Sequence, residues 1–187
     1  LTFDDGPHPG RTRPVLRLLA SECTQATFFL LGRNAAMYPK LVGEIRDAGH
    51  TLGGHTWDHA NLTELPLALA LDNAQAGNRA VEDAAGLPVA LFRFPYVATT
   101  PPLSATIAEA GLIDVTVTVD GADWTRISTR ASADRIMTKL EQDGRRGIIL
   151  LHDPFSGSEQ RTRHLLRRLK EEGYRIVHIT GPAENQP

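Results

Sequence analysis

The sequence lacks several features that would place it in a special class of protein. It contains a single cysteine, Cys23, so no internal disulfide can form. The sequence has no run of 18 apolar residues, the length needed to span a membrane. The net charge is −2, and no basic stripe or acidic tail indicates nucleic-acid binding or disorder. With 187 residues, 41% hydrophobic and 22% charged, residues 1–187 are expected to form one globular domain.

The beginning of the chain is uninformative about localisation. Leu1-Thr2-Phe3 is already an apolar, strand-like run that leads directly into Asp4. We therefore expect that a preceding segment has been removed or left out, and a signal peptide is neither visible nor excluded.

Strand-like and helix-like segments alternate along the chain. The strand-like runs are Leu1–Phe3, Thr27–Leu31, His50–Gly53, Ala90–Phe94, Asp114–Val119, Gly147–Leu151 and Arg175–Ile179. The helix-like runs, with apolar residues at three- and four-residue spacing, are Arg13–Glu22, Pro39–Ala48, Leu65–Ala85, Leu103–Ala110, Ala133–Asp143 and Glu159–Glu172. This alternation predicts an α/β protein with a parallel sheet. The tail Gly181–Pro187 is expected to fray.

Five polar clusters follow strand-like runs. They are Asp4-Asp5, His55 to His59, Arg93 to Tyr96, Asp120 to Trp124, and His152-Asp153. In a β/α fold the carboxyl ends of the strands share one face, and such folds place their chemistry there. Too many strands end in polar clusters for the single crevice of an open sheet to bring them together. We therefore favour a closed or nearly closed barrel of about seven strands. The side chains gathered there predict a metal-dependent enzyme.

Histidines and adjacent carboxylates in these clusters suit a metal. On a helical turn, His55 and His59 would place both imidazoles on one side, although such pairs are also common as structural histidines. Asp4 and Asp5 leave a strand in opposite directions, so one can bind a metal while the other addresses a water. Asp-Gly-Pro is also a common turn sequence. Two imidazoles and one carboxylate would leave positions open on a catalytic ion.

The remaining clusters suit acid–base chemistry. If Arg93 is buried it needs an anion, which a pocket around Asp4 would supply, although it could instead lie on a surface edge. An aspartate beside His152 would raise the pKa of the imidazole and suit it as a general acid. Trp124 could form an apolar wall of a pocket or stack on a sugar, although a lone tryptophan is more often a core residue.

Taken in order, the clusters resemble the motifs of the NodB-like polysaccharide deacetylases, carbohydrate esterase family 4. The family patterns T-F-D-D-G-P, H-[S/T]-x-x-H, R-x-P-[Y/F]-G, D-x-x-D-W and L-x-H are matched by Thr2–Pro7, His55–His59, Arg93–Tyr96, Asp120–Trp124 and Leu150–His152. The resemblance implies a distorted (β/α) barrel and one divalent metal, usually zinc, with cobalt or nickel possible. It also implies hydrolysis of acetyl groups from N-acetylglucosamine units or, in some members, from O-acetylated xylan.

The resemblance also implies a role for each matched residue. Asp4 corresponds to the general base, and the ligands correspond to Asp5, His55 and His59. Arg93 corresponds to the residue that positions the base, and the backbone N–H of Tyr96 to an oxyanion donor. The general acid and its partner correspond to His152 and Asp123, and the walls of the acetyl pocket to Trp124 and Leu150.

The sequence departs from the family pattern at Val97, where the family has glycine. Because a β-branched residue avoids positive φ, we expect the loop after Tyr96 to take another path. Two competing functions are a non-catalytic carbohydrate-binding relative and a barrel amidase acting on a small amide. By resemblance we expect an acetylated glycan as partner, no nucleic acid, a monomer, and a secreted, periplasmic or cell-surface location.

Overall fold

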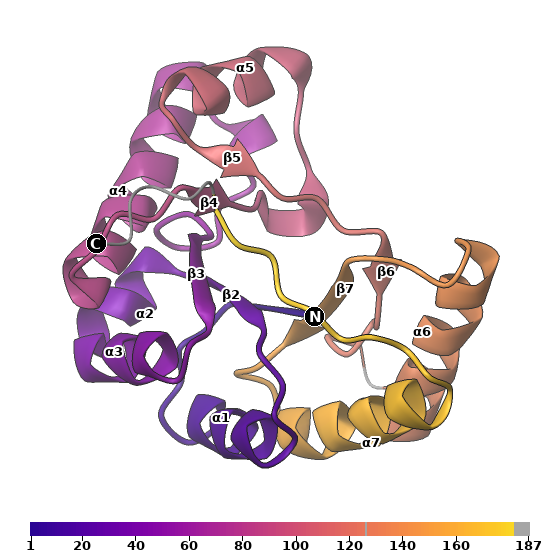
Figure 1. Cartoon of the computed structure of the whole chain (residues 1–187). Helices are drawn as coiled ribbons and strands as arrows, with labels where there is room; N and C mark the ends of the chain where they lie inside the picture. The colour runs from indigo at the N-terminus through magenta and orange to yellow at the C-terminus, as the bar shows by residue number, and fades with distance from the viewer. Residues whose placement is uncertain (126, 182–187) are drawn as a thin grey trace.

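The protein folds as a curled parallel sheet surrounded by helices (Figure 1). The computed structural model describes residues 1–125 and 127–181, so the expected fraying of residues 182–187 lies outside the described residues. The strands are β1 (Thr2–Asp4), β2 (Thr27–Leu30), β3 (Thr51–Gly54), β4 (Leu91–Phe92), β5 (Ile113–Asp114), β6 (Val119–Asp120) and β7 (Ile149–His152). Their order is β5-β4-β3-β2-β1-β7-β6, and all the pairings are parallel. The predicted distorted barrel is confirmed.

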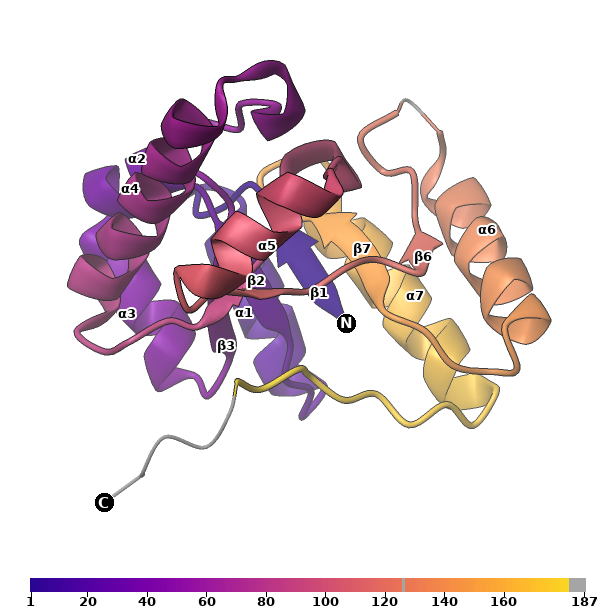
Figure 2. The same cartoon turned by 90° about the horizontal axis from the view of Figure 1, so that it is seen from above.

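The helices lie on the outside of the curled sheet (Figures 1 and 2). They are α1 (Thr12–Ser21), α2 (Gly32–Met37), α3 (Pro39–Asp47), α4 (Leu67–Ala85), α5 (Pro101–Glu109), α6 (Thr129–Gln142) and α7 (Ser158–Glu171), with short 3₁₀ turns at Leu62–Glu64 and Pro95–Val97. All six predicted helices are present, with ends that differ by a few residues. The sequence analysis missed α2, because its six residues are too few to show an apolar period.

Strand side chains alternate between the helices and the barrel interior. Phe3 and Phe28 face outward, where their rings stack 5.0 Å apart in the main core with α1, α3 and α7. Phe29 faces inward and packs with Leu91 and Val115. Thr2 and Asp4 share the inward face of β1, so the same alternation that builds the outer core directs polar groups into the barrel.

The predicted strand Asp114–Val119 is instead two short strands on opposite edges of the sheet. β5 pairs with β4, and β6 pairs with β7, while residues 115–118 cross between the two edges. The carbonyl groups of Val115 and Thr116 accept hydrogen bonds from the Arg93 side chain, at 2.9 and 3.4 Å. This side chain occupies acceptors that a neighbouring strand would use, and residues 115–118 connect the two edge strands without pairing them.

The predicted strand Arg175–Ile179 is also absent. This segment is extended coil that passes beneath the amino-terminal ends of the strands (Figure 2). Val177 accepts a hydrogen bond from the Leu1 nitrogen at 3.0 Å, and Ile179 bonds through both N–H and C=O to the Thr27 hydroxyl at 2.9 Å. A side-chain hydroxyl takes the place of a strand backbone, so no ladder forms, while Ile179 still packs into the barrel interior.

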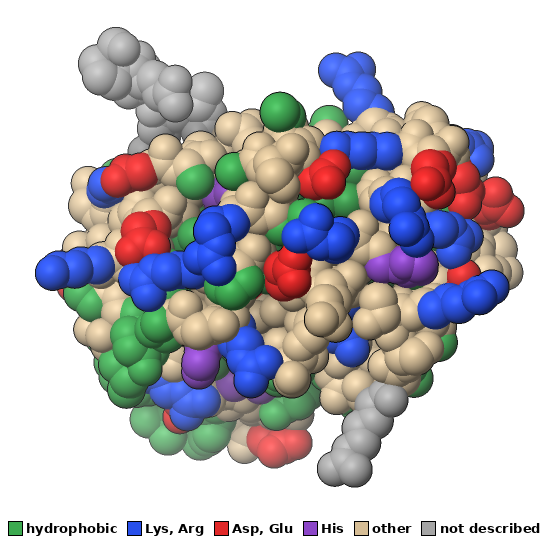
Figure 3. All heavy atoms as spheres, turned by 90° about the horizontal axis from the view of Figure 1, so that it is seen from below, with side chains coloured by type: hydrophobic (Ala, Val, Ile, Leu, Met, Phe, Trp, Pro, Cys, Tyr) green, Lys and Arg blue, Asp and Glu red, His purple; other side chains and the backbone are tan. Residues whose placement is uncertain are grey.

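Side chains of both signs are interspersed over the face that Figure 3 shows. Several form ion pairs, including Arg13 with Glu44 at 2.8 Å and Lys170 with Glu22 at 2.6 Å. Such exposed pairs are screened by water and contribute little to stability. Among the residues described, no helix is long and apolar enough to cross a membrane.

Gly53 of β3 leaves the space that Phe29 fills. A Cβ added at Gly53 would lie 2.5 Å from the Phe29 ring and 3.2 Å from the Leu91 carbonyl oxygen. We expect Gly53→Ala to lower the free energy of unfolding by about 2 kcal/mol, because neither the buried ring nor the backbone can move freely. Urea denaturation measures this. Gly43→Ala in α3, where the nearest atom is 3.9 Å from the added Cβ, is the control. Equal losses in the two variants would contradict the steric explanation.

Candidate active site

The five polar clusters converge at the carboxyl ends of the strands. In the sheet register Asp4 pairs with His152, and Asp120 pairs with Leu150. The other clusters follow β3 and β4 directly, and the backbone N–H of Arg93 donates to the carbonyl of Gly54 at 3.0 Å. Residues far apart in sequence therefore share one mouth of the barrel.

Asp5, His55 and His59 form a compact group that could hold a metal ion. Their potential ligand atoms all lie within 4.8 Å of one another. Asp5 Oδ1 is 3.5 Å from His55 Nε2 and 3.3 Å from His59 Nε2. This oxygen is buried and has no hydrogen-bond partner among the described residues. A buried carboxylate oxygen without a partner is costly, and a divalent cation would satisfy it. The donor set of two imidazoles and one carboxylate fits zinc.

The orientation of His55 is fixed by a backbone carbonyl. His55 Nδ1–H donates to the Arg93 carbonyl at 2.8 Å, which leaves the Nε2 lone pair directed at Asp5. Burial lowers the pKa of His55, and the negative charges of Asp4 and Asp5 oppose this only partly. The imidazole is therefore held neutral, in the form that binds metals.

The loop that carries the two histidines is not helical, contrary to the prediction from their spacing. Residues 55–61 form a loop in which Thr56 and His59 have φ values of 67° and 68°. The Thr56 hydroxyl accepts a hydrogen bond from the His59 N–H at 3.1 Å. The two imidazole centroids lie 5.1 Å apart, so a turn with two left-handed residues brings the rings together.

Arg93 and Asp4 form a buried ion pair beside this group. Arg93 is 1% exposed, and one of its terminal nitrogens donates to Asp4 Oδ1 and to the Thr2 hydroxyl, both at 2.7 Å. The guanidinium also lies 4.1 Å above the Phe29 ring. Asp4 Oδ2 lies 3.8 Å from His55 Nε2. One carboxylate oxygen is thus anchored by Arg93 while the other faces the candidate metal group.

Asp123 accepts two hydrogen bonds from His152. Its Oδ1 accepts from His152 Nδ1–H at 2.7 Å, and its Oδ2 accepts from the His152 backbone N–H at 2.8 Å. Burial alone would lower the pKa of His152. The hydrogen bond and negative charge of Asp123 outweigh burial and, with Asp4 and Asp5, raise this pKa to about 9. His152 is therefore an imidazolium at neutral pH, and its Nε2 is the free end of the ring.

Exposed aromatic residues lie at the rim, and the predicted wall residues differ in burial. Trp124 is 61% exposed and Tyr96 is 67% exposed, whereas Leu150 is 7% exposed. The Tyr96 ring meets the His59 ring edge-on at 4.7 Å between centroids. Phe155 stacks on His152 at 5.1 Å.

Asp153 is a buried acidic residue to which the sequence analysis gave no role. The Thr12 hydroxyl donates to Asp153 Oδ2 and accepts the His8 backbone N–H at 2.8 Å. Burial, aided by the charge of Asp5, raises the pKa of Asp153 to about 7 against the Thr12 hydrogen bond. Its position next to His152 was the one signal in the sequence that could have indicated a role. Its partner Thr12 is 141 residues away, and no motif connects the two residues.

The backbone conformation of Val97 differs from the expectation for a β-branched residue. Both residues are left-handed, with φ of 60° and 54°. The Val97 N–H donates to the Phe94 carbonyl at 3.1 Å, and the next N–H donates to Pro95 at 3.0 Å, which holds the turn. Val97 is 42% exposed, so its side chain has room although its backbone is strained. The expectation that the β-branch of Val97 keeps it from positive φ is therefore wrong, while the path of this loop relative to other family members stays a prediction.

Together these features define a class of protein: a β/α barrel whose mouth holds a candidate metal group, a buried carboxylate and a buried imidazolium. The profile of the polysaccharide deacetylase family matches residues 1–115. The chitooligosaccharide deacetylase of Bradyrhizobium sp. (strain ANU 289) is 37% identical over 166 residues, which are 87% of this chain and 73% of that protein. The chain belongs to the polysaccharide deacetylase family.

Other relatives extend the likeness. The peptidoglycan-N-acetylmuramic acid deacetylase PdaC of Bacillus subtilis (strain 168) is 32% identical over 96% of this chain, which spans only 37% of PdaC. A family 4 carbohydrate esterase from Streptomyces lividans, solved with acetate, has a TM-score of 0.85 and 30% identity, covering 98% of this chain and 92% of that one. A Bacillus anthracis structure described as a family 4 pseudoenzyme has a TM-score of 0.86 and 26% identity, covering 95% and 62%. Activity must therefore be argued from this chain's own residues.

Replacing Val97 by glycine should stabilise the protein. Glycine adopts positive φ without the penalty that a side chain incurs, although its greater freedom in the unfolded chain offsets part of the gain. We expect Val97→Gly to raise the free energy of unfolding by about 1 kcal/mol, measured by chemical denaturation. Val97→Ala removes the β-branch but keeps Cβ, so it should recover less. A loss of stability in Val97→Gly would contradict the strain.

Proposed function

We propose that this domain is a metal-dependent N-deacetylase that hydrolyses acetamido groups of amino-sugar glycans. The observation that carries the proposal is the grouping of Asp5, His55 and His59 beside the buried carboxylate of Asp4, whose register partner on the next strand is the imidazolium of His152. The relatives named as chitooligosaccharide and peptidoglycan deacetylases support the substrate class. We treat residues 1–187 as one catalytic domain.

Asp5, His55 and His59 would hold the cation, for which we propose zinc. Bound there, a divalent cation supplies Lewis acidity that polarises the acetyl carbonyl and acidifies a water. Deacetylation then needs a base for the water and an acid for the nitrogen.

Asp4 is the proposed base. Arg93 anchors one of its oxygens, and the other oxygen faces His55 at 3.8 Å, on the side where a water would attack. Asp4 removes a proton from the water while the water oxygen bonds to the acetyl carbon. The developing oxyanion accepts a hydrogen bond from the backbone N–H of Tyr96.

His152 is the proposed acid. Asp123 holds Nδ1–H, so the Nε2 proton faces the site, and His152 gives it to the leaving nitrogen as the C–N bond breaks. The products are acetate and a free amino sugar. A cationic acid favours an amide over an ester, because an amine leaves only after protonation. Trp124 and Tyr96, both exposed at the rim, suit contact with sugar rings.

Removing the metal and removing the base should distinguish the metal-binding role of His59 from the proton-removing role of Asp4. Chelation should abolish acetate release from acetylated chitooligosaccharides, and added zinc should restore it. His59→Ala should lower zinc content, because a ligand is lost. Asp4→Asn should retain zinc and lower kcat by a factor of about 100 or more, because only the base is lost. Mass spectrometry of the chitooligosaccharides, peptidoglycan fragments and acetylxylan identifies the substrate.

Full activity without metal would contradict the metal role, and preference for acetylxylan would identify an ester hydrolase. Carbohydrate binding without acetate release from any of the three would identify a non-catalytic relative.

The pH profile of kcat/KM should report His152. An acid must be protonated to act, so a pKa raised to about 9 extends activity well above the ordinary histidine pKa of 6.5, and activity falls as pH rises through the raised value. Asp123→Asn removes the charge that raises the pKa while burial still lowers it. The basic limb should therefore move to lower pH. A bound dication would lower the pKa in both proteins, so the difference between them is the measurement. A lost metal with an unmoved limb would make Asp123 a support of the metal group instead.

A further inference from the structure

The loop that carries His55 and His59 rests on backbone from two helices. Gly32 and Arg33, at the start of α2, donate their N–H groups to the carbonyls of Thr56 and Trp57 at 2.9 and 3.0 Å. Thr56 is fully buried. The two carbonyls of the loop are thus fixed from one side.

Helix α4 touches the same two residues. A Cβ added at Gly77 would lie 2.2 Å from the Thr56 carbonyl carbon, 2.3 Å from its oxygen, and 2.7 Å from the Trp57 nitrogen. One turn earlier, Asn73 Oδ1 accepts the Trp57 N–H at 2.9 Å, and Asn73 Nδ2 donates to Asp58 at 3.0 Å. Asn73 and Gly77 share a helix face because they are four residues apart.

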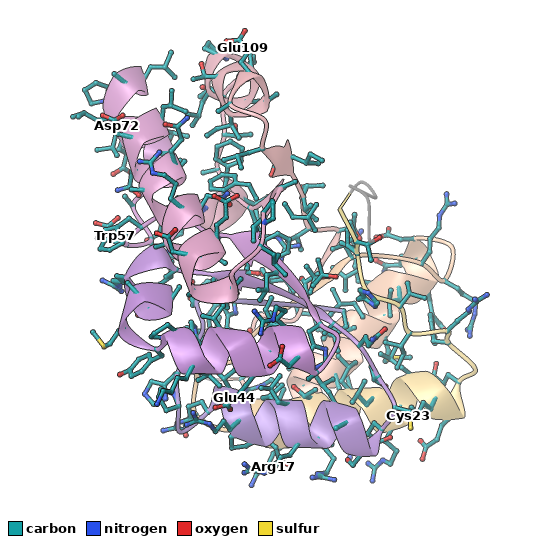
Figure 4. The ribbon with its side chains drawn as sticks, turned by 60° about the vertical axis from the view of Figure 1, so that its left-hand side comes forward. Arg17, Cys23, Glu44, Trp57, Asp72 and Glu109 are labelled. Carbon is teal, nitrogen blue, oxygen red and sulfur yellow. The ribbon has the colours of Figure 1, made fainter. Side chains whose placement is uncertain are left out.

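The Trp57 ring is part of this support and not of the catalytic mouth. It lies beside α2 and α4 (Figure 4). With Arg79 and Asp83 it lines an outer hollow of about 510 Å³. Its edge would be 2.9 Å from a Cβ at Gly32. Trp57 therefore packs outward while the histidines on either side of it turn into the site.

We propose that Asn73 and Gly77 of α4 are positioning residues for the metal group. The loop holds Thr56 and His59 at positive φ, a conformation disfavoured for residues with side chains, so something outside the loop must maintain it. Gly77 lets the helix backbone touch the loop, and Asn73 fixes the Trp57 amide. This inference rests on the proposed metal role of His55 and His59.

Gly77→Ala is the first test, in the full chain. The added methyl group meets backbone, which cannot move aside as a flexible side chain would, so the loop must shift. We expect zinc affinity, measured by chelator competition, to fall about tenfold or more, in the range seen for residues that orient ligands. The visible spectrum of the cobalt-substituted protein should also change. Gly43→Ala, the same substitution in α3 where the nearest atom lies 3.9 Å from the added Cβ, should keep affinity and spectrum unchanged.

Asn73 provides a second variant that does not depend on core packing. Asn73→Ala should weaken zinc binding several-fold and alter the cobalt spectrum. Asn73→Asp combined with Asp58→Asn keeps an acceptor for the Trp57 N–H without opposing two carboxylates, and it should recover part of the affinity. Gln75→Ala, on the same helix but over a separate hollow with Pro88 and Leu112, is the control and should bind zinc normally.

The outcomes distinguish this inference from the proposed function. If the wild-type protein binds zinc but Gly77→Ala and Asn73→Ala bind it within twofold of wild type, even with lower melting temperatures, the two residues support only stability and the positioning role is overturned. If Gly77→Ala does not fold, the Asn73 variants decide. A wild-type protein that binds no zinc overturns both the metal role and the inference that rests on it.

Discussion

The buried charge of Arg93 is the constraint on which the rest of the site depends. A guanidinium inside a barrel is tolerated only if its hydrogen bonds and charge are met, and breaking such a pair costs about 3–5 kcal/mol. Here it is met by Asp4 and Thr2 from β1 and by the carbonyls of Val115 and Thr116. Its own carbonyl orients His55. One residue thus links the closure of the barrel, the carboxylate of Asp4 and the imidazole of His55.

Two buried histidines acquire opposite characters from their partners. Burial by itself acts to lower the pKa of both His55 and His152. The Nδ1–H of His55 meets an uncharged carbonyl, and its pKa stays low, whereas that of His152 meets the carboxylate of Asp123 and its pKa rises to about 9. A neutral ring that can bind a cation and a charged ring that can give a proton therefore coexist, and the difference lies in the acceptor opposite Nδ1.

The sequence contained enough information for the architecture, the polar clusters and the family, because strand–helix alternation and the order of motifs are local patterns. What it could not contain was geometry set by distant partners. The segment Asp114–Val119 reads as one β-prone strand, but the Arg93 side chain donates hydrogen bonds to two carbonyls inside it. The spacing of His55 and His59 suggests a helix, but contacts from α2 and α4 hold a loop instead. The left-handed Val97 violates a residue preference that hydrogen bonds in its turn override.

The segment at residues 174–181 brings the end of the described chain back to its beginning. The Leu1 nitrogen bonds to Val177, and Ile179 bonds to Thr27, all beneath the amino-terminal ends of the strands. This floor is opposite the carboxyl ends, where the site lies. Since residues 1 and 177–181 lie on this floor, a polypeptide fused before residue 1 would start on the side of the barrel opposite the candidate site.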